Sequence, residues 1–428
     1  MRRRHFLQLG LLGTFGSASA PARPRRTAGR VLVAGGGFAG ATCARYLRLL
    51  DPAIDVILVD PDTRYVTCPM SNEALAGLRP IASLAVSRDG LRRAGVQVLR
   101  DRVQAVEFAP RRVRLAGGAT LTYDRLVIAP GIRFLWDTPE GYDRAAAARM
   151  PHAWKAGTQT ELLGAQLRAM ADGGVFAISV PRAPYRCPHA PYERASLLAW
   201  YFKRHKPRSK ILIFDANNQM PYQELFAPAW QELYPGMIEW IPMTEQGAVL
   251  RVDPATLTLY TASGAHRVAV ANVIPPQAPG ALARELGLSS GRGWCPVDPH
   301  TFESSLAGKV HVIGDACIAD PMPRSASSAN SQAKQCALAI AAELAGRAPP
   351  LPSLHNTCYL MMAPRYAAST SGIYRVGEGA IEAVPGAGGP SPVQAPAALR
   401  AQEAAYAEGW YEGIIADSFG AGGRRDRG

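Results

Sequence analysis

The sequence has no CxxCH motif and no CxxC pair, and no cluster of cysteine and histidine that supports a metal site. A c-type haem attaches through the first of these motifs, and structural zinc sites use closely spaced cysteine and histidine ligands. No apolar run approaches the ~18 residues that a membrane-spanning helix needs. No stretch rich in lysine and arginine carries interleaved aromatic residues, a pattern typical of nucleic-acid-binding surfaces. We therefore expect no haem, no metal, no nucleic-acid partner and no stable membrane insertion.

The chain is nonetheless basic, with 47 lysines and arginines against 34 aspartates and glutamates and a net charge of +13. Such a surface attracts acidic partners and small anions, although simple solubility explains it equally well. A chain of 428 residues is too long for one ordinary core, so we expect two or three domains.

The N-terminus has the pattern of an export signal. Arg3 and Arg4 precede Phe6 and Leu7, which matches the twin-arginine pattern, and a short, weakly apolar stretch with small residues follows. We expect residues 1–22 to be a twin-arginine signal peptide and the mature protein to work in a bacterial periplasm. The alternative is a disordered basic tail.

A complete dinucleotide-binding unit begins near residue 31. An apolar strand leads into a GxGxxG loop, a helix follows, and a second strand ends in an acid about 20 residues after the loop. Gly35 permits the tight turn, Gly37 lets the backbone approach a pyrophosphate, and Gly40 lets the helix pack closely on the strand. Asp60 is expected to bind the ribose hydroxyls of the adenosine. A glycine-rich turn in another α/β fold is the alternative.

Two further segments indicate which dinucleotide is bound. One strand ends in Ala129-Pro130-Gly131, and another ends in Gly314-Asp315. Flavoproteins of the disulfide-reductase superfamily carry such segments, and this sequence resembles that superfamily over most of its length. The resemblance implies that FAD is the cofactor, that Asp315 contacts its ribityl chain, and that Ala129, Gly131 and Gly314 lie beside it.

A second βαβ unit has lost its phosphate-binding glycines. The strand at 175–180 runs into a loop that reads PRAPYRCP, and a helix near 192–203 and a strand at 210–215 complete the unit. Prolines offer no N–H group to a phosphate, and side chains would crowd the pyrophosphate. We therefore predict a second Rossmann-type domain without a nicotinamide site, and NAD(P)H is not expected to be the electron donor.

Seven cysteines are an odd number for an exported chain. Cys68 lies just beyond the first dinucleotide unit, so its thiol should be close enough to a flavin to bond to the isoalloxazine ring or to take part in redox chemistry beside it. Four other cysteines in apolar or helical contexts are expected to be small buried residues, namely Cys43, Cys295, Cys317 and Cys336. The remaining two, Cys187 and Cys358, occur in loop-like settings far downstream.

Five segments carry a closer resemblance: TCPMSNE, YRCPHAPYERAS, GWCPVD with TFESS, IGDACIADPMP and NTCY. They resemble the flavoprotein subunit of flavocytochrome c sulfide dehydrogenase across nearly the whole mature chain. The resemblance implies a thioether between Cys68 and FAD, and an active-site disulfide between Cys187 and Cys358. It also implies that Glu193 is a candidate proton acceptor for hydrosulfide and that a c-type cytochrome is the partner.

These functional roles have structural alternatives. The Cys187–Cys358 bridge could be an ordinary structural disulfide of an exported protein. Glu193 could simply stabilise the dipole of the helix that it begins. Trp410, in a helical segment near the C-terminus, could wall the flavin or merely pack.

The predicted fold is glutathione-reductase-like α/β, with two Rossmann-type domains and a C-terminal α+β interface domain. The predicted FAD-binding domain is discontinuous, at 29–140 and 280–346; the second Rossmann-like domain is 141–279, and the C-terminal domain is 347–428. Within the C-terminal domain we expect strands and a helix over 351–374, and a loop over 377–396, which is rich in Gly, Pro and Ala. The expected function is periplasmic oxidation of sulfide to sulfur or polysulfide, with electrons passed to cytochrome c. The alternatives are a sulfide:quinone oxidoreductase and a non-enzymatic accessory flavoprotein of a sulfur-oxidising system.

Overall fold

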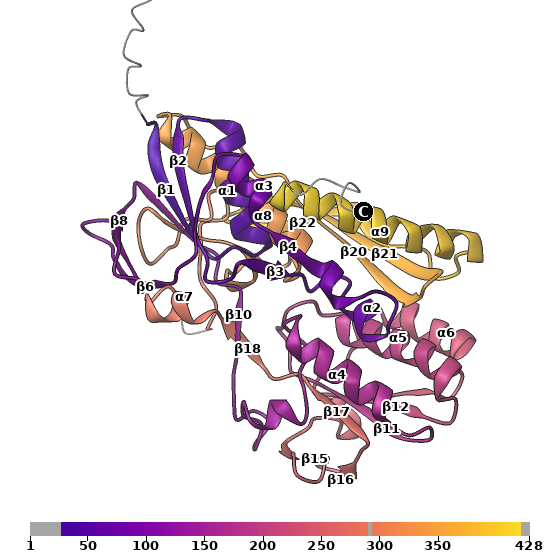
Figure 1. Ribbon diagram of the computed structural model, residues 1–428. Helices are drawn as coiled ribbons and strands as arrows, with labels where there is room; N and C mark the ends of the chain where they lie inside the picture. The colour runs from indigo at the N-terminus through magenta and orange to yellow at the C-terminus, as the bar shows by residue number, and fades with distance from the viewer. Residues whose placement is uncertain (1–26, 290–292, 421–428) are drawn as a thin grey trace, which may run out of the picture.

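The computed structural model describes residues 27–289 and 293–420, and the predicted signal peptide lies outside them. Figure 1 shows a first parallel sheet near the start of the chain, a second one in the middle of the chain, and a C-terminal sheet with the long helix α9 along it. This is the predicted α/β class with two Rossmann-type sheets and a C-terminal α+β part.

The first sheet is parallel, with the strand order β19-β9-β1-β2-β5. Its central strand is fully buried at Val31, Leu32 and Val33, as expected for a strand covered on both faces. Helices α1 and α8 pack against each other beside it. The bounds are β1 Gly29–Ala34, α1 Phe38–Leu50, β2 Ile54–Val59, β5 Gln97–Leu99, β9 Arg125–Ile128, β19 Val310–Val312 and α8 Ala326–Leu344.

The second sheet is also parallel, with the order β13-β12-β11-β17. Strands β11 and β12 have the bounds that the sequence predicted, and helix α5 between them begins two residues earlier. The bounds are α4 Thr158–Ala169, β11 Val175–Val180, α5 Ala190–His205, β12 Lys210–Asp215, α6 Gln223–Leu233, β13 Ile238–Ile241 and β17 Val270–Val273.

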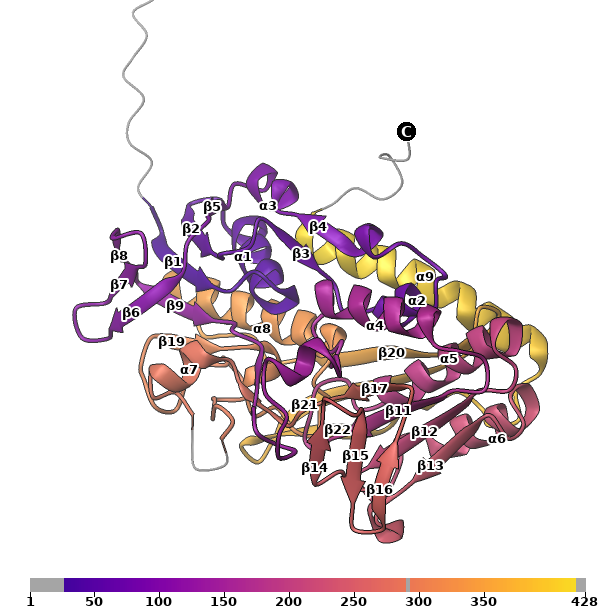
Figure 2. The same cartoon turned by 60° about the horizontal axis from the view of Figure 1, so that its bottom comes forward.

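The C-terminal part contacts both Rossmann-type parts of the chain. Its antiparallel sheet, β20-β21-β22, contacts α5 and α8 through β20 and α9 through β21, and both views show α9 running along it (Figures 1 and 2). The far end of α9 reaches α1, where Ser418 Oγ lies 2.9 Å from Thr42 Oγ1. The bounds are β20 Leu354–Ala363, β21 Tyr366–Gly377, β22 Ala380–Pro390 and α9 Ala397–Phe419.

Two predictions for this part were wrong. The segment 351–374 was expected to include a helix, but it forms only strand β20 and the first part of β21. The segment 377–396 was expected to be a loop because it is rich in Gly, Pro and Ala. Ala380–Pro390 is instead strand β22, which lies at the sheet edge and pairs across a register shift between Gly372 and Tyr374. Edge strands and bulges are where sheets tolerate glycine and proline.

Two short antiparallel strands, β10 Ile132–Phe134 and β18 Gln277–Pro279, pair where the chain passes from the first sheet to the second and back (Figure 1). Among the described residues, none of the helices combines the length and apolar character that a membrane crossing needs.

Smaller sheets and helices complete the fold. Their bounds are β3 Arg64–Val66, α2 Ser71–Leu75, β4 Ala85–Ser87, α3 Asp89–Arg93, β6 Val103–Glu107, β7 Arg112–Leu115, β8 Thr120–Thr122, β14 Arg251–Asp253, β15 Thr258–Thr261, β16 Gly264–Arg267 and α7 Ala281–Glu285.

Candidate active site

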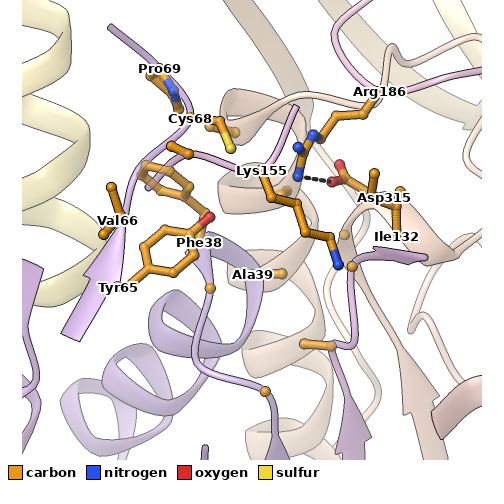
Figure 3. A pocket seen from close by; sticks show the side chains of 18 of the residues that line it. Phe38, Ala39, Tyr65, Val66, Cys68, Pro69, Ile132, Lys155, Arg186 and Asp315 are labelled. Carbon is orange, nitrogen blue, oxygen red and sulfur yellow. Dashed lines mark ion pairs between the residues drawn. The ribbon is translucent and has the colours of Figure 1, made fainter. Parts of the chain in front are cut away.

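A cavity of about 990 Å³ draws its lining from all three parts of the chain, which makes it large for a ligand pocket. It runs from the glycine-rich loop after β1 to the loop before α5 and to strand β20. Every predicted site residue except Gly40 lines it, namely Gly35, Gly37, Asp60, Cys68, Ala129, Gly131, Cys187, Glu193, Gly314, Asp315 and Cys358. Figure 3 shows the part of this cavity around Cys68 and Asp315.

The close packing around the glycine-rich loop shows why glycine is needed at two of its positions. A Cβ atom on Gly40 would lie 1.8 Å from the carbonyl oxygen of Gly35, and one on Gly35 (φ +102°) would lie 2.3 Å from that of Ala129. Both positions therefore require glycine, which lets α1 pack closely on the sheet. A Cβ atom on Gly37 would meet only the ring of Tyr65, at 3.7 Å, so this glycine keeps the cavity wide.

The N-terminus of α1 opens on the cavity, and no side chain caps it. The first turn of a helix has unpaired N–H groups and partial positive charge, which suit a pyrophosphate. Asp60, at the end of β2, accepts hydrogen bonds from the N–H groups of Gly36 (2.5 Å) and Asp62 (2.8 Å). This end of the cavity therefore fits the ADP half of FAD, with Asp60 held at the position of the ribose.

The other half of the cofactor fits between the ends of β9 and β19. The Gly131 position (φ +62°) has no atom within 4 Å of a Cβ, and Gly314 has φ +77° with its N–H bonded to Gln332 Oε1 at 2.9 Å. The Asp315 carboxylate faces the cavity and lies 3.9 Å from Arg186 Nη1 (Figure 3). Burial raises its pKa, against the lowering effect of Arg186. An indole nitrogen of the lining, Trp154 Nε1, is buried without a hydrogen-bond partner.

Cys68 lies between β3 and α2 and points into the cavity (Figure 3). Its Sγ is 3.8 Å from the carbonyl oxygen of Trp154, to which the guanidinium of Arg186 also donates. The half-buried thiol is therefore accessible from the cavity and close to a cation.

Cys187 lies in the loop that replaces the missing glycine-rich loop of the second sheet. Its backbone has φ +54°, a conformation that costs free energy in a residue with a side chain and is common at functional sites. Its N–H donates to the carbonyl of Arg324 at 2.7 Å, and Sγ lies 3.7 Å from His189 Nε2. Desolvation raises the pKa of this thiol well above its usual value, and the nearby Cys358 and Glu193 raise it further.

Cys358 reaches the same place from β20. It is buried, and its Sγ lies 3.6 Å from both side-chain polar atoms of Asn356. Desolvation raises its pKa to about 11. The structure records both Cys187 and Cys358 as free thiols. Both line the cavity, and Cys358 is close enough for its charge to raise the pKa of Cys187. The fold therefore brings together the two cysteines that the sequence places far apart.

Glu193, in the first turn of α5, lies beside these thiols. Its Oε1 accepts a hydrogen bond from Asn72 Nδ2 at 3.0 Å. Burial is the largest cause that raises its pKa to about 7, while the bond from Asn72 acts in the opposite direction. A carboxyl group with this pKa can accept and release a proton near neutral pH.

Several lining residues were missed from the sequence. Arg186 precedes Cys187 directly, so a cation beside a candidate catalytic cysteine was an available signal, whereas Lys155 and Trp154 belong to no motif. Trp410 lines the cavity, and its ring centroid lies 6.2 Å from that of Tyr359. Its packing role is therefore confirmed, and its role beside the flavin stays a prediction.

Family models match three parts of the chain. Residues 160–275 match the model "Sulfide dehydrogenase [flavocytochrome c] flavoprotein chain, central". Residues 350–419 match "Flavocytochrome c sulphide dehydrogenase, flavin-binding", and residues 29–147 match "Pyridine nucleotide-disulphide oxidoreductase". The two sheets and the C-terminal part thus each carry a match.

Individual relatives agree with these models. The flavoprotein chain of the flavocytochrome c sulfide dehydrogenase of Chlorobaculum thiosulfatiphilum is 65% identical over 43 residues, which are 10% of this chain and 90% of that sequence. The mitochondrial sulfide:quinone oxidoreductase of Mus musculus is 24% identical over 319 residues, 71% of this chain and 68% of that protein. The solved sulfide:quinone oxidoreductase of Aquifex aeolicus has the same fold, with a TM-score of 0.70 at 14% identity over 92% of each chain.

Proposed function

Because this chain belongs to the family of flavoprotein chains of flavocytochrome c sulfide dehydrogenase, we propose that it oxidises sulfide to sulfur or polysulfide. One observation carries the proposal. Two thiols, Cys187 and Cys358, and a carboxyl group with a pKa of about 7, Glu193, line the same cavity as the dinucleotide loop. Bound FAD would supply the acceptor of two electrons from sulfur.

The cysteines would act as a redox-active disulfide. Hydrosulfide attacks one sulfur of the Cys187–Cys358 bond, so that bond breaks while a new sulfur–sulfur bond forms in a persulfide. The other cysteine leaves as a thiolate and carries the electron pair of the broken bond. Glu193 accepts the proton of the hydrosulfide, since its carboxylate is available near neutral pH. Arg186 stabilises the anionic sulfur species with its fixed positive charge.

The chain's own residues would hold the cofactor. The first turn of α1 and Gly37 receive the pyrophosphate, Asp60 takes the ribose, and Asp315 takes the ribityl chain. Cys68 would form the covalent tether, because its thiol opens on the cavity beside Trp154.

We propose a c-type cytochrome as electron acceptor, which is what the name of the matched family indicates. Similarity to sulfide:quinone oxidoreductases over most of the chain makes a quinone the second candidate. The test is steady-state oxidation of sulfide by the purified flavoprotein with either acceptor. Turnover with cytochrome c and none with a short-chain quinone supports the first. The reverse supports the second, and turnover with neither contradicts both.

The proposed location is the periplasm, which rests on the twin-arginine pattern at Arg3 and Arg4. Replacing both with lysine should leave the protein in the cytoplasm, as cell fractionation would show. Unchanged export of that variant would contradict the proposal.

A further inference from the structure

Outside the cavity, a group of three side chains that could bind a metal ion lies beside β19, the edge strand of the first sheet. Glu303 pairs with His311 of β19 across an isolated bridge, and Glu343 comes from the last turn of α8. One ligand atom from each of these side chains lies within 4.8 Å of the other two. Ligands of a single tetrahedral ion at bond lengths of about 2.0–2.2 Å lie roughly 3–4 Å apart, so a small adjustment would close the group around a cation.

The histidine is held in the form that binds metals. His311 is 0% exposed, and its Nδ1 lies 3.0 Å from the carbonyl oxygen of Thr301. A carbonyl oxygen only accepts, so Nδ1 carries the hydrogen and Nε2 keeps its lone pair. That Nε2 is buried with no hydrogen-bond partner. A buried acceptor without a partner is costly, and a cation at this position would satisfy it.

Each carboxylate also keeps one oxygen for a ligand. Glu303 uses Oε1 to accept the N–H of Lys309 at 2.6 Å. Glu343 uses Oε2 to accept both Nε (3.0 Å) and Nη2 (2.9 Å) of Arg125. The second oxygen of each group is not used by these bonds. Arg125 therefore orients Glu343 in the way that outer partners orient metal-binding carboxylates.

The charges allow an added cation. Two carboxylates and one guanidinium around a neutral imidazole leave one net negative charge, at a place where the imidazole is buried and both carboxylates are partly buried. A protonated imidazole would cancel it without an ion, and that is the competing arrangement. A divalent ion gives the unpartnered nitrogen a bond as well.

We propose that Glu303, His311 and Glu343 bind one divalent transition-metal ion, with Zn²⁺ as the best fit. One imidazole and two carboxylates are ligands that zinc accepts, whereas Mg²⁺ and Ca²⁺ prefer oxygen alone. The ion joins β19, the segment before it and the end of α8. Since β19 leads directly into Gly314 and Asp315, the site would brace the support of the candidate flavin cavity. The prediction of no metal site considered cysteine motifs, and this group contains no cysteine.

The test is the zinc content of the untagged, purified flavoprotein after removal of metals with a chelator and dialysis against dilute Zn²⁺. We expect one more zinc per chain in the wild type than in Glu303→Gln, and affinity at least about 100-fold weaker in the variant, because loss of a ligand should exceed the loss of an outer partner. Cavity thiols that bind zinc contribute equally to both proteins, so the difference reports this site. The half-buried His300 on the same segment, which is not one of the three ligands, provides the control His300→Ala, which should keep the ion.

His311→Ala is the second variant and should lose the same zinc, with far-ultraviolet circular dichroism confirming that it folds. Arg125→Gln provides a further readout: because Arg125 holds the carboxylate of Glu343, its loss should weaken zinc binding by about 10–100-fold, less than the loss of a ligand does. Equal zinc content in wild type and Glu303→Gln would overturn the proposal. A zinc affinity of Arg125→Gln equal to that of the wild type would contradict the role of Arg125 in holding Glu343.

Discussion

The guanidinium of Arg186 and the thiol of Cys68 are directed at the same acceptor, the carbonyl oxygen of Trp154. Arg186 also lies 3.9 Å from Asp315, and its charge acts against the burial that raises the pKa of its neighbour Cys187. One cation thus stands between the proposed tether, the predicted ribityl contact and one of the redox cysteines. Cys358 has no such influence from Arg186 among the causes of its raised pKa.

Replacing Arg186 with glutamine should raise the pKa of the Cys187 thiol further, because a cationic neighbour that favours the thiolate is lost. The measurement is the rate of alkylation of Cys187 against pH in the reduced enzyme, followed by peptide mass analysis. Cys358 in the same samples is the internal control, and Arg186→Lys should restore most of the rate. Parallel shifts at both cysteines would show that Arg186 acts by changing the structure instead.

Glu193 should give the rate of sulfide oxidation a pH dependence. Burial raises its pKa to about 7, so the carboxylate that accepts a proton is present above this pH and lost below it. Activity should therefore rise through pH 7 in the wild type, and Glu193→Gln should be slower by about 10²–10⁴-fold and lack this limb. Sulfide itself also titrates in this pH range, and the pH dependence of the rate that remains in Glu193→Gln shows how much sulfide contributes.

A stability measurement checks the same carboxyl group. Its folded-state pKa of about 7 lies above its ordinary value of 4.5, so the folded state binds the proton more tightly. The wild type should lose stability relative to Glu193→Gln as pH rises from 4.5 to 7. An identical pH dependence of thermal unfolding in both proteins would mean that Glu193 has an ordinary pKa.

Counting thiols tests the proposed bonds of the cysteines. Of seven cysteines, one bonded to the flavin and two bonded to each other leave four that react with a thiol reagent in the denatured, unreduced chain. Cys187→Ser should raise this number to five, although it removes a cysteine, because Cys358 becomes free. A count of six in the wild type would instead agree with thiols at both positions.

The covalent tether has its own test. Acid precipitation of the wild type should leave a yellow pellet, with the mass of FAD on the Cys68 peptide. Cys68→Ala should release its flavin to the supernatant while still binding FAD before precipitation, since the glycine-rich loop and Asp315 are intact. Cys336→Ala, which removes a buried cysteine outside the cavity, should stay yellow.

The sequence predicted the parts of the fold that obey local rules. The turn at Gly35, the acid at Asp60 and the strands β11 and β12 follow from spacing and apolar runs, because each depends on its nearest neighbours in the chain. Strand β22 could not be predicted in this way, since its pairing with β21 overrides the local preference of its glycines and prolines.

In the candidate site, too, local sequence predicted some features and only the fold showed the others. The place of Cys68 after the dinucleotide unit pointed to it, and resemblance supplied the roles of Cys187, Glu193 and Cys358. Only the fold shows that the four residues share a cavity. Lys155 was missed because a lone cation has no sequence pattern. Arg186 had a signal in its place next to Cys187, but its importance comes from the groups that converge on it in the fold. The Glu303–His311–Glu343 group is a stronger example, as its members come from separate segments with no motif.

The most direct test of the account is anaerobic addition of sulfide to the purified flavoprotein, with flavin absorbance followed in a single turnover. We predict rapid bleaching in the wild type, none in Cys358→Ser with its flavin still bound, and none in the wild type with NADH. Bleaching of Cys358→Ser at the wild-type rate would remove the cysteines from the reaction. A wild-type flavin that sulfide leaves oxidised would contradict the proposed function itself.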